Sequence, residues 1–353
     1  MAYERKADHI DICLNREVNA DHNHWGSVHM LHKALPEIDM NKIDTSVELF
    51  GKELAAPIVI SAITGGFEGA EEINRNLAEA AARAGVGLGV GSQRPAVEDP
   101  ELASSYECIT DYDVPLVIGN VGAPQLIRQE NRQAFGIDGC RNAMKMIKAD
   151  ILAIHLNYLQ EIVQPEGDTK AKGCLDAIGA IAQELPVIAK ETGAGLSRDV
   201  AQDLRVKGVK GFDVGGMGGT SFAAVEYHRA NAKGDERLAR LGDTFWNWGI
   251  PTPLSILEAD IGLPIIATGG LNTGLDTARA IALGATAGGY SRKMLEPAMK
   301  SADAVEKELE MLVAELKAAM FLVGAWDVES LQNAPVIVTG HLSEWLNAME
   351  PEG

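Results

Sequence analysis

Short apolar runs recur through the middle of the chain, and most of them are separated by segments with the apolar spacing of helices. A run of four to eight apolar residues bounded by turn residues is typical of a buried strand. Strands that alternate with helices form parallel βαβ units. The eight predicted strands are Pro57–Ala62, Val86–Val90, Pro115–Gly119, Asp150–His155, Pro186–Lys190, Val209–Val214, Pro264–Thr268 and Thr286–Tyr290.

The number of strands favours one fold class. Eight parallel strands close a (β/α)8 barrel, and about 250 residues is its usual size. Residues 57–296 fit that length, so we predict an α/β protein built on a TIM barrel, with a doubly wound open sheet as the alternative. The predicted helices between the strands include Glu71–Ala84, Asp138–Lys148, Ala171–Glu184, Arg198–Lys207 and Gly274–Leu283.

Three segments extend the minimal barrel. Residues 1–56 form a polar N-terminal extension, in which Arg5, Lys6 and His9 have the spacing of one side of a short helix. Residues 223–252 are a long insertion after the sixth strand, and a loop of that length is usually a lid or an interface. Residues 297–353 form a C-terminal segment, where Leu295–Val323 predicts a helix.

The composition limits the classes of molecule that we expect this protein to bind. The 353 residues include 50 acidic and 31 basic side chains, a net charge of −19. That charge argues against a nucleic-acid or anionic-membrane surface, where Lys and Arg must meet phosphates. Four widely spaced cysteines indicate reduced thiols. The N-terminus has no apolar core of a signal peptide, and no apolar run approaches the roughly 20 residues of a membrane helix, so we expect a cytoplasmic protein.

The most informative stretch is His155–Asp168, HLNYLQEIVQPEGD, which begins where the fourth strand ends. It brings an imidazole, amides and carboxylates together, and barrel enzymes place their chemistry in the loops at this end of the strands. The other strands also end in polar or glycine-rich sequence, which a set of ordinary turns does not explain. These ends are Ser61–Gly66, Gly91–Arg94, Asn120, Lys190–Gly193, Asp213–Ser221, Thr268–Asn272 and Ser291–Arg292.

Individual residues suggest particular ligands. Glycine loops after strands six to eight allow backbone N–H groups to approach a phosphate, although tight turns also use glycine. Lys190 closes an apolar strand and could be a Schiff-base nucleophile, a phosphate partner, the cation beside a reduced flavin, or a lysine extended to the rim. Glu161 is the best single candidate for Mg²⁺, which shares one carboxylate with substrate phosphates; a surface carboxylate or an arginine partner is the alternative.

These residues resemble the type 2 isopentenyl diphosphate isomerases over nearly the whole chain. The most specific match is the QExxQPEG segment from Gln160 to Gly167, beside His155-x-Asn157. The further matches are Arg5-Lys6-x-x-His9, Thr64-Gly65-Gly66, Gly91-Ser92-Gln93-Arg94, Asn120, Lys190-Glu191, Asp213–Ser221 and Gly269-Gly270. Asn272 departs from the family, which often has arginine there, so binding of the FMN phosphate is expected to be rearranged.

The resemblance implies an FMN-bound barrel of isoprenoid biosynthesis that interconverts isopentenyl and dimethylallyl diphosphate by moving one proton. It implies Mg²⁺ on Glu161, NAD(P)H as the reductant of the flavin, and a homo-oligomer (tetramer or octamer). Carried over by position, the catalytic residues would be Gln160, His155 and Asn157. Residues that bind the small-molecule diphosphate would be Arg5, Lys6, His9, Ser92, Gln93, Arg94, His155, Asn157 and Gln160. FMN would be held by Ala62, Ile63, Thr64, Ser92, Asn120, Lys190, Thr220, Gly269, Gly270, Leu271, Asn272, Ser291 and Arg292.

Three other functions remain open at the level of sequence. The first is an FMN-dependent barrel oxidoreductase of the 2-hydroxy-acid oxidase type, which would consume its reductant stoichiometrically. The second is a phosphate-binding barrel without catalysis, and the third is an aldolase that uses Lys190. Flavin absorbance, reductant stoichiometry and borohydride trapping distinguish these three from the isomerase.

Overall fold

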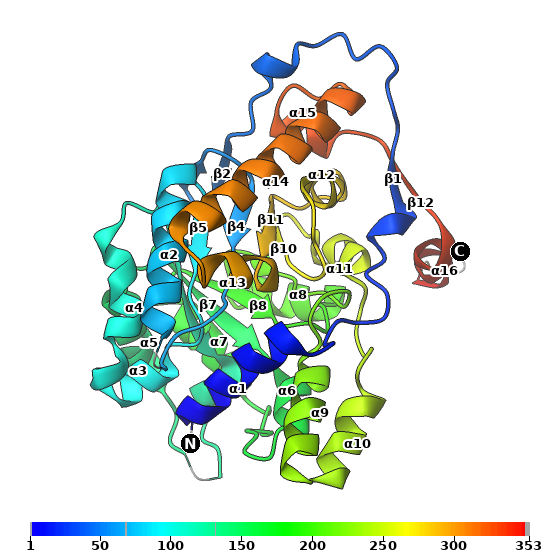
Figure 1. Cartoon of the computed structure of the whole chain (residues 1–353). Helices are drawn as coiled ribbons and strands as arrows, with labels where there is room; N and C mark the ends of the chain where they lie inside the picture. Colours follow the sequence, from blue (N-terminus) through cyan, green and yellow to red (C-terminus); the bar gives the residue numbers. More distant parts are fainter. Residues whose placement is uncertain (1, 68, 131, 350–353) are drawn as a thin grey trace.

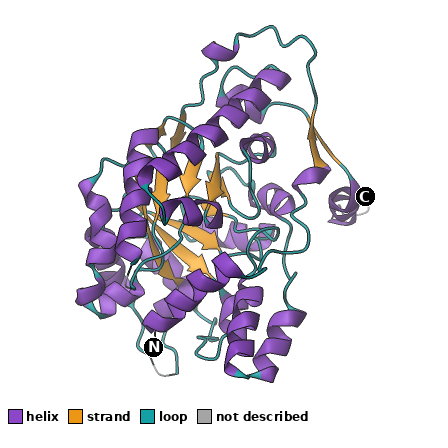
Figure 2. Cartoon of the chain, in the orientation of Figure 1, coloured by secondary structure: helices purple, strands orange, loops and turns teal. Residues whose placement is uncertain are grey.

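The central feature of the structure, a computed structural model, is a closed barrel of eight parallel strands (Figures 1 and 2). Residues 2–67, 69–130 and 132–349 are described, with side chains from Lys6 onward. The last strand pairs with the first, from Gly288–Ile58 to Tyr290–Ile60, so the sheet has no edge and the predicted TIM barrel is confirmed. Its strands are β4 (Ile58–Ile60), β5 (Gly87–Gly89), β6 (Leu116–Gly122), β7 (Ile151–Leu156), β8 (Val187–Glu191), β9 (Phe212–Asp213), β10 (Ile265–Ala267) and β11 (Ala287–Tyr290).

Helices surround the barrel, and each helix predicted between the strands is found within three residues of its expected start. The largest difference is at Ala171, because Gly173 adopts φ +95° and the helix begins only after it. After β5 the chain forms two short helices, α3 (Arg94–Glu98) and α4 (Ser104–Glu107). The other helices of the barrel layer are α2 (Ala70–Ala84), α5 (Gly136–Met146), α6 (Tyr158–Val163), α7 (Cys174–Ala182), α8 (Arg198–Val206), α11 (Thr252–Ala259), α12 (Gly274–Ala282) and α13 (Arg292–Ala298).

The barrel interior is filled at its N-terminal end. Alternate strand residues point inward, so Val59 packs inside while its neighbours Ile58 and Ile60 face the helices. The hairpin of β2 (Val47–Leu49) and β3 (Lys52–Leu54) adds Leu49 and Leu54 to this inner cluster. The inner strand residues are Val59, Leu116, Ile118, Ile151, Ala153, Ile188, Ile266 and Ala287. These side chains occupy the N-terminal half of the barrel and leave room for a large cavity at the C-terminal ends of the strands.

The segments before and after the barrel pack against each other. Strand β1 (Val28–Met30) pairs antiparallel with β12 (Val336–Val338), which brings the two parts of the chain side by side (Figure 1). The predicted helix Leu295–Val323 is wrong as one element, because α13 ends at Ala298 and Ser301 caps a new helix by accepting the Ala304 N–H. The C-terminal helices are α14 (Ala302–Val323), α15 (Val328–Gln332) and α16 (Gly340–Met349). Short 3₁₀ helices elsewhere in the chain are η1 (Trp25–Ser27), η2 (Met40–Lys42), η3 (Pro100–Leu102), η4 (Cys108–Asp111) and η5 (Ala123–Leu126).

Two elements lie over the open end of the barrel. Helix α1 (Ala2–Asn15) crosses the C-terminal ends of the strands (Figure 1). The long insertion is a helical hairpin rather than a loop, formed by α9 (Phe222–Lys233) and α10 (Glu236–Thr244), and α9 packs on both α1 and α6. In the part of the chain that the structure describes, no helix has the length and apolar content to cross a bilayer.

Candidate active site

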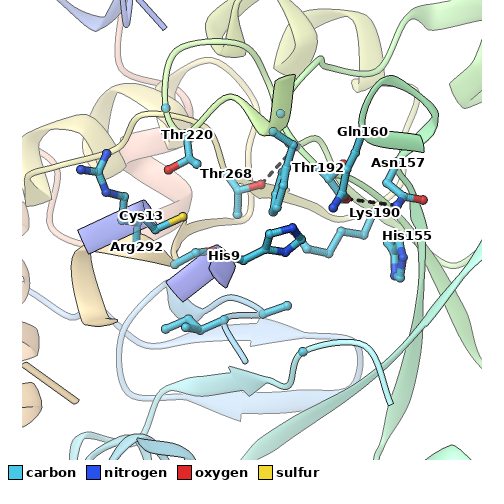
Figure 3. Close-up of a pocket in the computed structure, with 18 of the residues that line it drawn as sticks. His9, Cys13, His155, Asn157, Gln160, Lys190, Thr192, Thr220, Thr268 and Arg292 are labelled. Carbon is cyan, nitrogen blue, oxygen red and sulfur yellow. Dashed lines mark hydrogen bonds between the residues drawn. The ribbon is translucent and has the colours of Figure 1, made fainter. Parts of the chain in front are cut away.

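A cavity of about 580 Å³ lies where the strands end, beneath α1. Residues from the ends of all eight strands line it, together with side chains of α1 (Figure 3). Most of the residues that the sequence singled out therefore meet in one place. Those that line the cavity are Lys6, His9, Ala62, Ile63, Thr64, Ser92, Arg94, Asn120, His155, Asn157, Gln160, Glu161, Lys190, Thr220, Gly269, Gly270, Leu271, Asn272, Ser291 and Arg292.

Helix α1 is fastened to the barrel by side chains that also face the cavity. Lys6 Nζ donates to the Ser92 carbonyl oxygen at 2.9 Å and to Tyr106 Oη at 2.8 Å, and it also contacts the Gly65 carbonyl oxygen. His9 Nε2 lies 2.8 Å from Glu226 Oε1 of α9. The helix thus contributes both a cation and an imidazole to the wall of the cavity.

His155 has a defined tautomer. Asn120 Nδ2 donates to the Val90 carbonyl oxygen at 3.0 Å, so its Oδ1 faces His155 Nδ1 at 2.8 Å. An amide oxygen only accepts, so Nδ1 of His155 carries a proton and donates. The imidazole is therefore held at the end of β7 by the neighbouring strand β6.

Glu161 orients the amides beside it. Asn157 Nδ2 donates to Glu161 Oε1 at 2.9 Å and to Gln160 Oε1 at 3.2 Å. The other oxygen, Glu161 Oε2, accepts from Gln164 Nε2 at 2.7 Å and from the Asp168 N–H at 2.6 Å. Because a carboxylate only accepts, Asn157 must present its nitrogen, and Gln160 must turn its oxygen toward Asn157. The Gln160 amide nitrogen is then the end available to a ligand.

The base of the cavity contains a buried ion pair. Lys190 Nζ donates to Asp213 Oδ2 at 2.7 Å, and Thr268 Oγ1 donates to the other oxygen of Asp213. The neighbouring carboxylate of Glu191 accepts from the backbone N–H groups of residues 193, 194 and 195 at 2.7, 2.6 and 2.9 Å. Burial outweighs these bonds and raises the pKa of Glu191 to about 7.

Glycine loops form the opposite end of the cavity. A Cβ on Gly219 would lie 2.6 Å from the Gly270 nitrogen, and Gly270 itself has φ +74°, so neither position accommodates a larger residue without strain. Arg292 starts α13 beside these loops, and its Nη1 donates to Asn19 Oδ1 at 2.8 Å. The glycine loops, the Arg292 guanidinium and the Lys190 ammonium all line the cavity, and together they suit a phosphorylated planar cofactor such as FMN.

Two predicted substrate contacts are not placed at the cavity. Gln93 is fully buried, and it donates to the Ala143 carbonyl oxygen at 2.7 Å and accepts the Asn120 N–H at 2.9 Å, so it supports β6 from behind. The side chain of Arg5 lies outside the described residues. Gln164 and Glu191, which belong to the quoted motifs without an assigned role, also line the cavity, whereas the lining residues Cys13, Asn19 and Phe222 had no signal in the sequence.

The carboxylates do not form a ready-made metal cage. Among the described residues, no group of three or more His, Cys, Asp or Glu side chains converges on one point. Glu161 is a single buried carboxylate between the cavity and the residues that bind it. Such a carboxylate is consistent only with a cation that takes most of its ligands from water or from the substrate.

Comparisons with known proteins agree with this geometry. The sequence model of the family described as FMN-dependent dehydrogenase matches residues 4–99 and 251–338. The isopentenyl-diphosphate delta-isomerase of Thermoplasma acidophilum is 45% identical over 348 residues, covering 99% of this chain and all of the relative. The enzyme of the same name from Archaeoglobus fulgidus is 46% identical, with 98% of each chain covered, and that from Methanosarcina barkeri is 46% identical, with 97% of this chain and 94% of the relative covered.

Solved structures show the same fold at low sequence identity. A mandelate oxidase variant with a monooxide FMN adduct has a TM-score of 0.62 and 19% identity, covering 95% of this chain and 92% of the other. Mandelate oxidase with 3,3-difluoro-2-hydroxy-3-phenylpropionic acid has a TM-score of 0.62 and 18% identity, covering 95% of each chain. At this identity the likeness establishes the barrel architecture alone.

Proposed function

Because the chain belongs to the family of the isopentenyl-diphosphate delta-isomerases, we propose that it interconverts isopentenyl diphosphate and dimethylallyl diphosphate. The reaction removes one proton and adds another two carbons away, with no net change of oxidation state. The substrate is small, with an anionic diphosphate at one end and an apolar alkene at the other. The cavity must therefore bind an anion and enclose an alkene.

The observation that carries the proposal is that polar side chains able to bind an anion lie at two separate ends of one cavity. Arg292 lies at the glycine-loop end, while His155 and Asn157 lie at the other (Figure 3). Arg94 also faces the cavity, and its contact with Asp168 at 3.5 Å ties it to the Glu161 side, since the Asp168 N–H binds Glu161. A protein with a net charge of −19 has two anionic groups to bind here, the phosphate of FMN and the diphosphate of the substrate.

The residues present fit FMN. The glycine loops and Arg292 would hold its phosphate, and Lys190 would lie against the ring, where a positive charge favours the reduced anion. Asn272 donates to the Gly270 carbonyl oxygen at 3.0 Å, so it stabilises the loop and leaves the ionic contact with the phosphate to Arg292. When bound in its reduced form, FMN supplies a ring nitrogen that gives and takes a proton.

Side chains of the chain itself place the alkene. Gln160 presents its amide nitrogen to the cavity, because Asn157 holds its oxygen. Ile10 of α1 and Phe222 of α9 contribute apolar surface to the same cavity. These residues exclude water from the reacting carbons, and that exclusion protects a cation-like transition state from being quenched.

We further propose that Glu161 holds Mg²⁺ and that NAD(P)H reduces the flavin. Mg²⁺ retains several waters and commonly combines one or two carboxylates with substrate phosphates, which matches the single buried Glu161. The reductant is needed only to bring the flavin to its active state, since the reaction itself transfers no electrons. We also expect a cytoplasmic homo-oligomer, tetramer or octamer, whose mass light scattering after gel filtration would report.

The decisive experiment is anaerobic incubation of the FMN-loaded protein with isopentenyl diphosphate, Mg²⁺ and NADPH, followed by product analysis. We expect dimethylallyl diphosphate with many turnovers for each NADPH oxidised. A parallel reaction without reductant controls for flavin state and should form little product. Stoichiometric use of NADPH with a reduced product would instead indicate a flavin oxidoreductase with net hydride transfer, and no product at any flavin state would contradict the isomerase.

A further inference from the structure

The helical insertion contains a buried arginine with carboxylates around it. Arg229 of α9 is 3% exposed, and its Nη1 donates to Glu226 Oε2 on the same helix at 2.5 Å. Its Nη2 donates at 3.0 Å to Glu166 Oε1, in the loop after α6. The third nitrogen, Nε, lies 3.6 Å from Asp8 Oδ2 on α1. One guanidinium thus touches three segments that are distant in sequence.

The same cluster extends to the cavity through His9. The second oxygen of Glu226, which is fully buried, lies 2.8 Å from His9 Nε2, and His9 lines the cavity. Helix α1 is therefore joined to α9 by His9 and by Asp8. Burying charges is costly unless each is bonded, and nothing in the barrel core requires these charges. The arrangement has a role at the cavity mouth that a purely apolar contact would not perform.

The loop bearing Glu166 encloses Glu161. Gln164 Nε2 and the Asp168 N–H both donate to Glu161 Oε2, at 2.7 and 2.6 Å. Gly167 packs so tightly that a Cβ there would lie 1.7 Å from the Glu161 carbonyl oxygen. The position of residues 164–168 therefore determines where the Glu161 carboxylate points, and Glu166 is the side chain by which α9 holds that loop.

We propose that Arg229 is a positioning residue that couples closure of α1 over the cavity to placement of Glu161 for the Mg²⁺ and diphosphate of the substrate. The inference rests on the proposed function for its substrate, and it assigns a role to the insertion that the reaction alone does not require. Charge-assisted bonds to two carboxylates give the guanidinium a defined geometry. When Glu166 is released, the loop loses this ion pair with α9 while Glu226 still pairs with Arg229.

The test uses Glu166→Ala, because removing Arg229 would leave the fully buried Glu226 carboxylate without this counter-charge and could prevent folding. We expect the half-saturating Mg²⁺ concentration and the KM for isopentenyl diphosphate to rise about 10-fold or more, the usual size for a residue that orients a metal ligand. FMN affinity should stay unchanged, and kcat at saturating substrate and Mg²⁺ should fall much less than KM rises. Glu166→Gln keeps an acceptor for Arg229 and should restore part of the loss.

The matched control is Glu184→Ala. Glu184 Oε2 binds Arg141 Nη2 at 2.8 Å in an exposed ion pair outside the cavity, so its loss should change neither KM nor the Mg²⁺ titration. Hydrogen–deuterium exchange of the FMN-loaded protein supplies a readout without substrate. Glu166→Ala should raise exchange in residues 2–15 and 158–168, and Glu184→Ala should not.

Two results would overturn the inference. One is an unchanged Mg²⁺ titration and KM in Glu166→Ala, and the other is exchange that rises only outside α1 and the 158–168 segment. Failure of the proposed function looks different, because the wild-type protein would then form no dimethylallyl diphosphate. In that case the exchange measurement still decides whether Arg229 joins α1 to the Glu161 loop.

Discussion

The ammonium group of Lys190 lies 2.7 Å from Oδ2 of Asp213, and both side chains are buried at the base of the cavity. Asp213 also accepts from Thr268 Oγ1, so its carboxylate is bonded from two directions. The two residues lie opposite each other on the neighbouring strands β8 and β9, near the C-terminal ends of both. The pair thus depends on the register of these two strands, and the Lys190 ammonium lines the cavity at the position proposed for the flavin.

The first prediction concerns the stability of this pair in the FMN-free protein. Asp213→Asn leaves the Lys190 ammonium buried without its counter-charge, and the free energy of unfolding should fall by about 3 kcal/mol. The double variant Lys190→Met/Asp213→Asn removes both charges and should recover much of that loss. Denaturant unfolding measures both changes. A double variant as unstable as the single one would show that packing, rather than the unpaired charge, sets the cost.

The second prediction concerns Gln160, whose amide is held by Asn157 at 3.2 Å. Gln160→Asn shortens the side chain by one methylene and withdraws the amide nitrogen from the cavity. We expect folded, FMN-loaded protein whose isomerisation rate falls about 100-fold, as displacements near 1 Å commonly cause. Product formation under anaerobic conditions measures the rate, and flavin absorbance reports loading.

Gln183→Asn is the matched control for that variant, because Gln183 is exposed at the end of α7 and outside the cavity. It makes the same chemical change and should leave the rate within about twofold of wild type, as expected for a surface substitution. Wild-type activity in Gln160→Asn would remove the catalytic assignment of Gln160, whatever the control shows.

The third prediction concerns the metal. Glu161→Gln keeps the size of the side chain but removes the negative charge, and it places an amide nitrogen against donors from Asn157 or Gln164. The half-saturating Mg²⁺ concentration should therefore rise by at least about 10-fold. FMN binding should not change. The measurement is a Mg²⁺ titration of the initial rate, and overlapping titrations for variant and wild type would reject Glu161 as the ligand.

The barrel and the location of the cavity followed from the sequence because both depend on local patterns. Apolar runs that alternate with helical segments specify parallel strands, and the polar residues at their ends, such as Asn120 and His155, must then meet at one rim. Contacts between segments that are distant in sequence do not follow from such local patterns. No spacing rule joins Glu226 to His9, or Arg229 to Glu166, which are 217 and 63 residues apart.

The pattern of apolar and polar residues also does not predict which polar side chains are buried. Gln93 lies among strand-end residues that face the cavity, yet its side chain points toward α5, because the Ala143 carbonyl oxygen and the Asn120 N–H offer it partners. The mixed charge of the insertion predicts a loop, but the structure has two helices there. Ser221 caps α9 and Asp235 caps α10, and serine and aspartate are both preferred at helix N-caps. Its charged residues belong to a buried network whose other members come from segments distant in sequence. Only the tertiary structure brings these members together.

The fourth prediction concerns Glu191, whose pKa is raised by burial from 4.5 to about 7. A raised folded-state pKa means that the folded protein binds this proton more tightly than the unfolded chain. The stability that Glu191 contributes is therefore fully present below its unfolded pKa and is lost as the pH rises through about 7. Each pKa unit corresponds to about 1.4 kcal/mol, so the whole effect is about 3 kcal/mol.

Glu191→Gln isolates this contribution, because glutamine does not titrate and its oxygen can still accept the N–H groups of residues 193–195. The difference in unfolding free energy, wild type minus variant, should fall as the pH rises from about 5 to about 8, and denaturant unfolding at several pH values measures it. A difference that stays constant over this range would mean that the three backbone donors outweigh burial and that Glu191 is a carboxylate throughout. The loop that lines the cavity beside Lys190 would then owe its shape to a fixed negative charge.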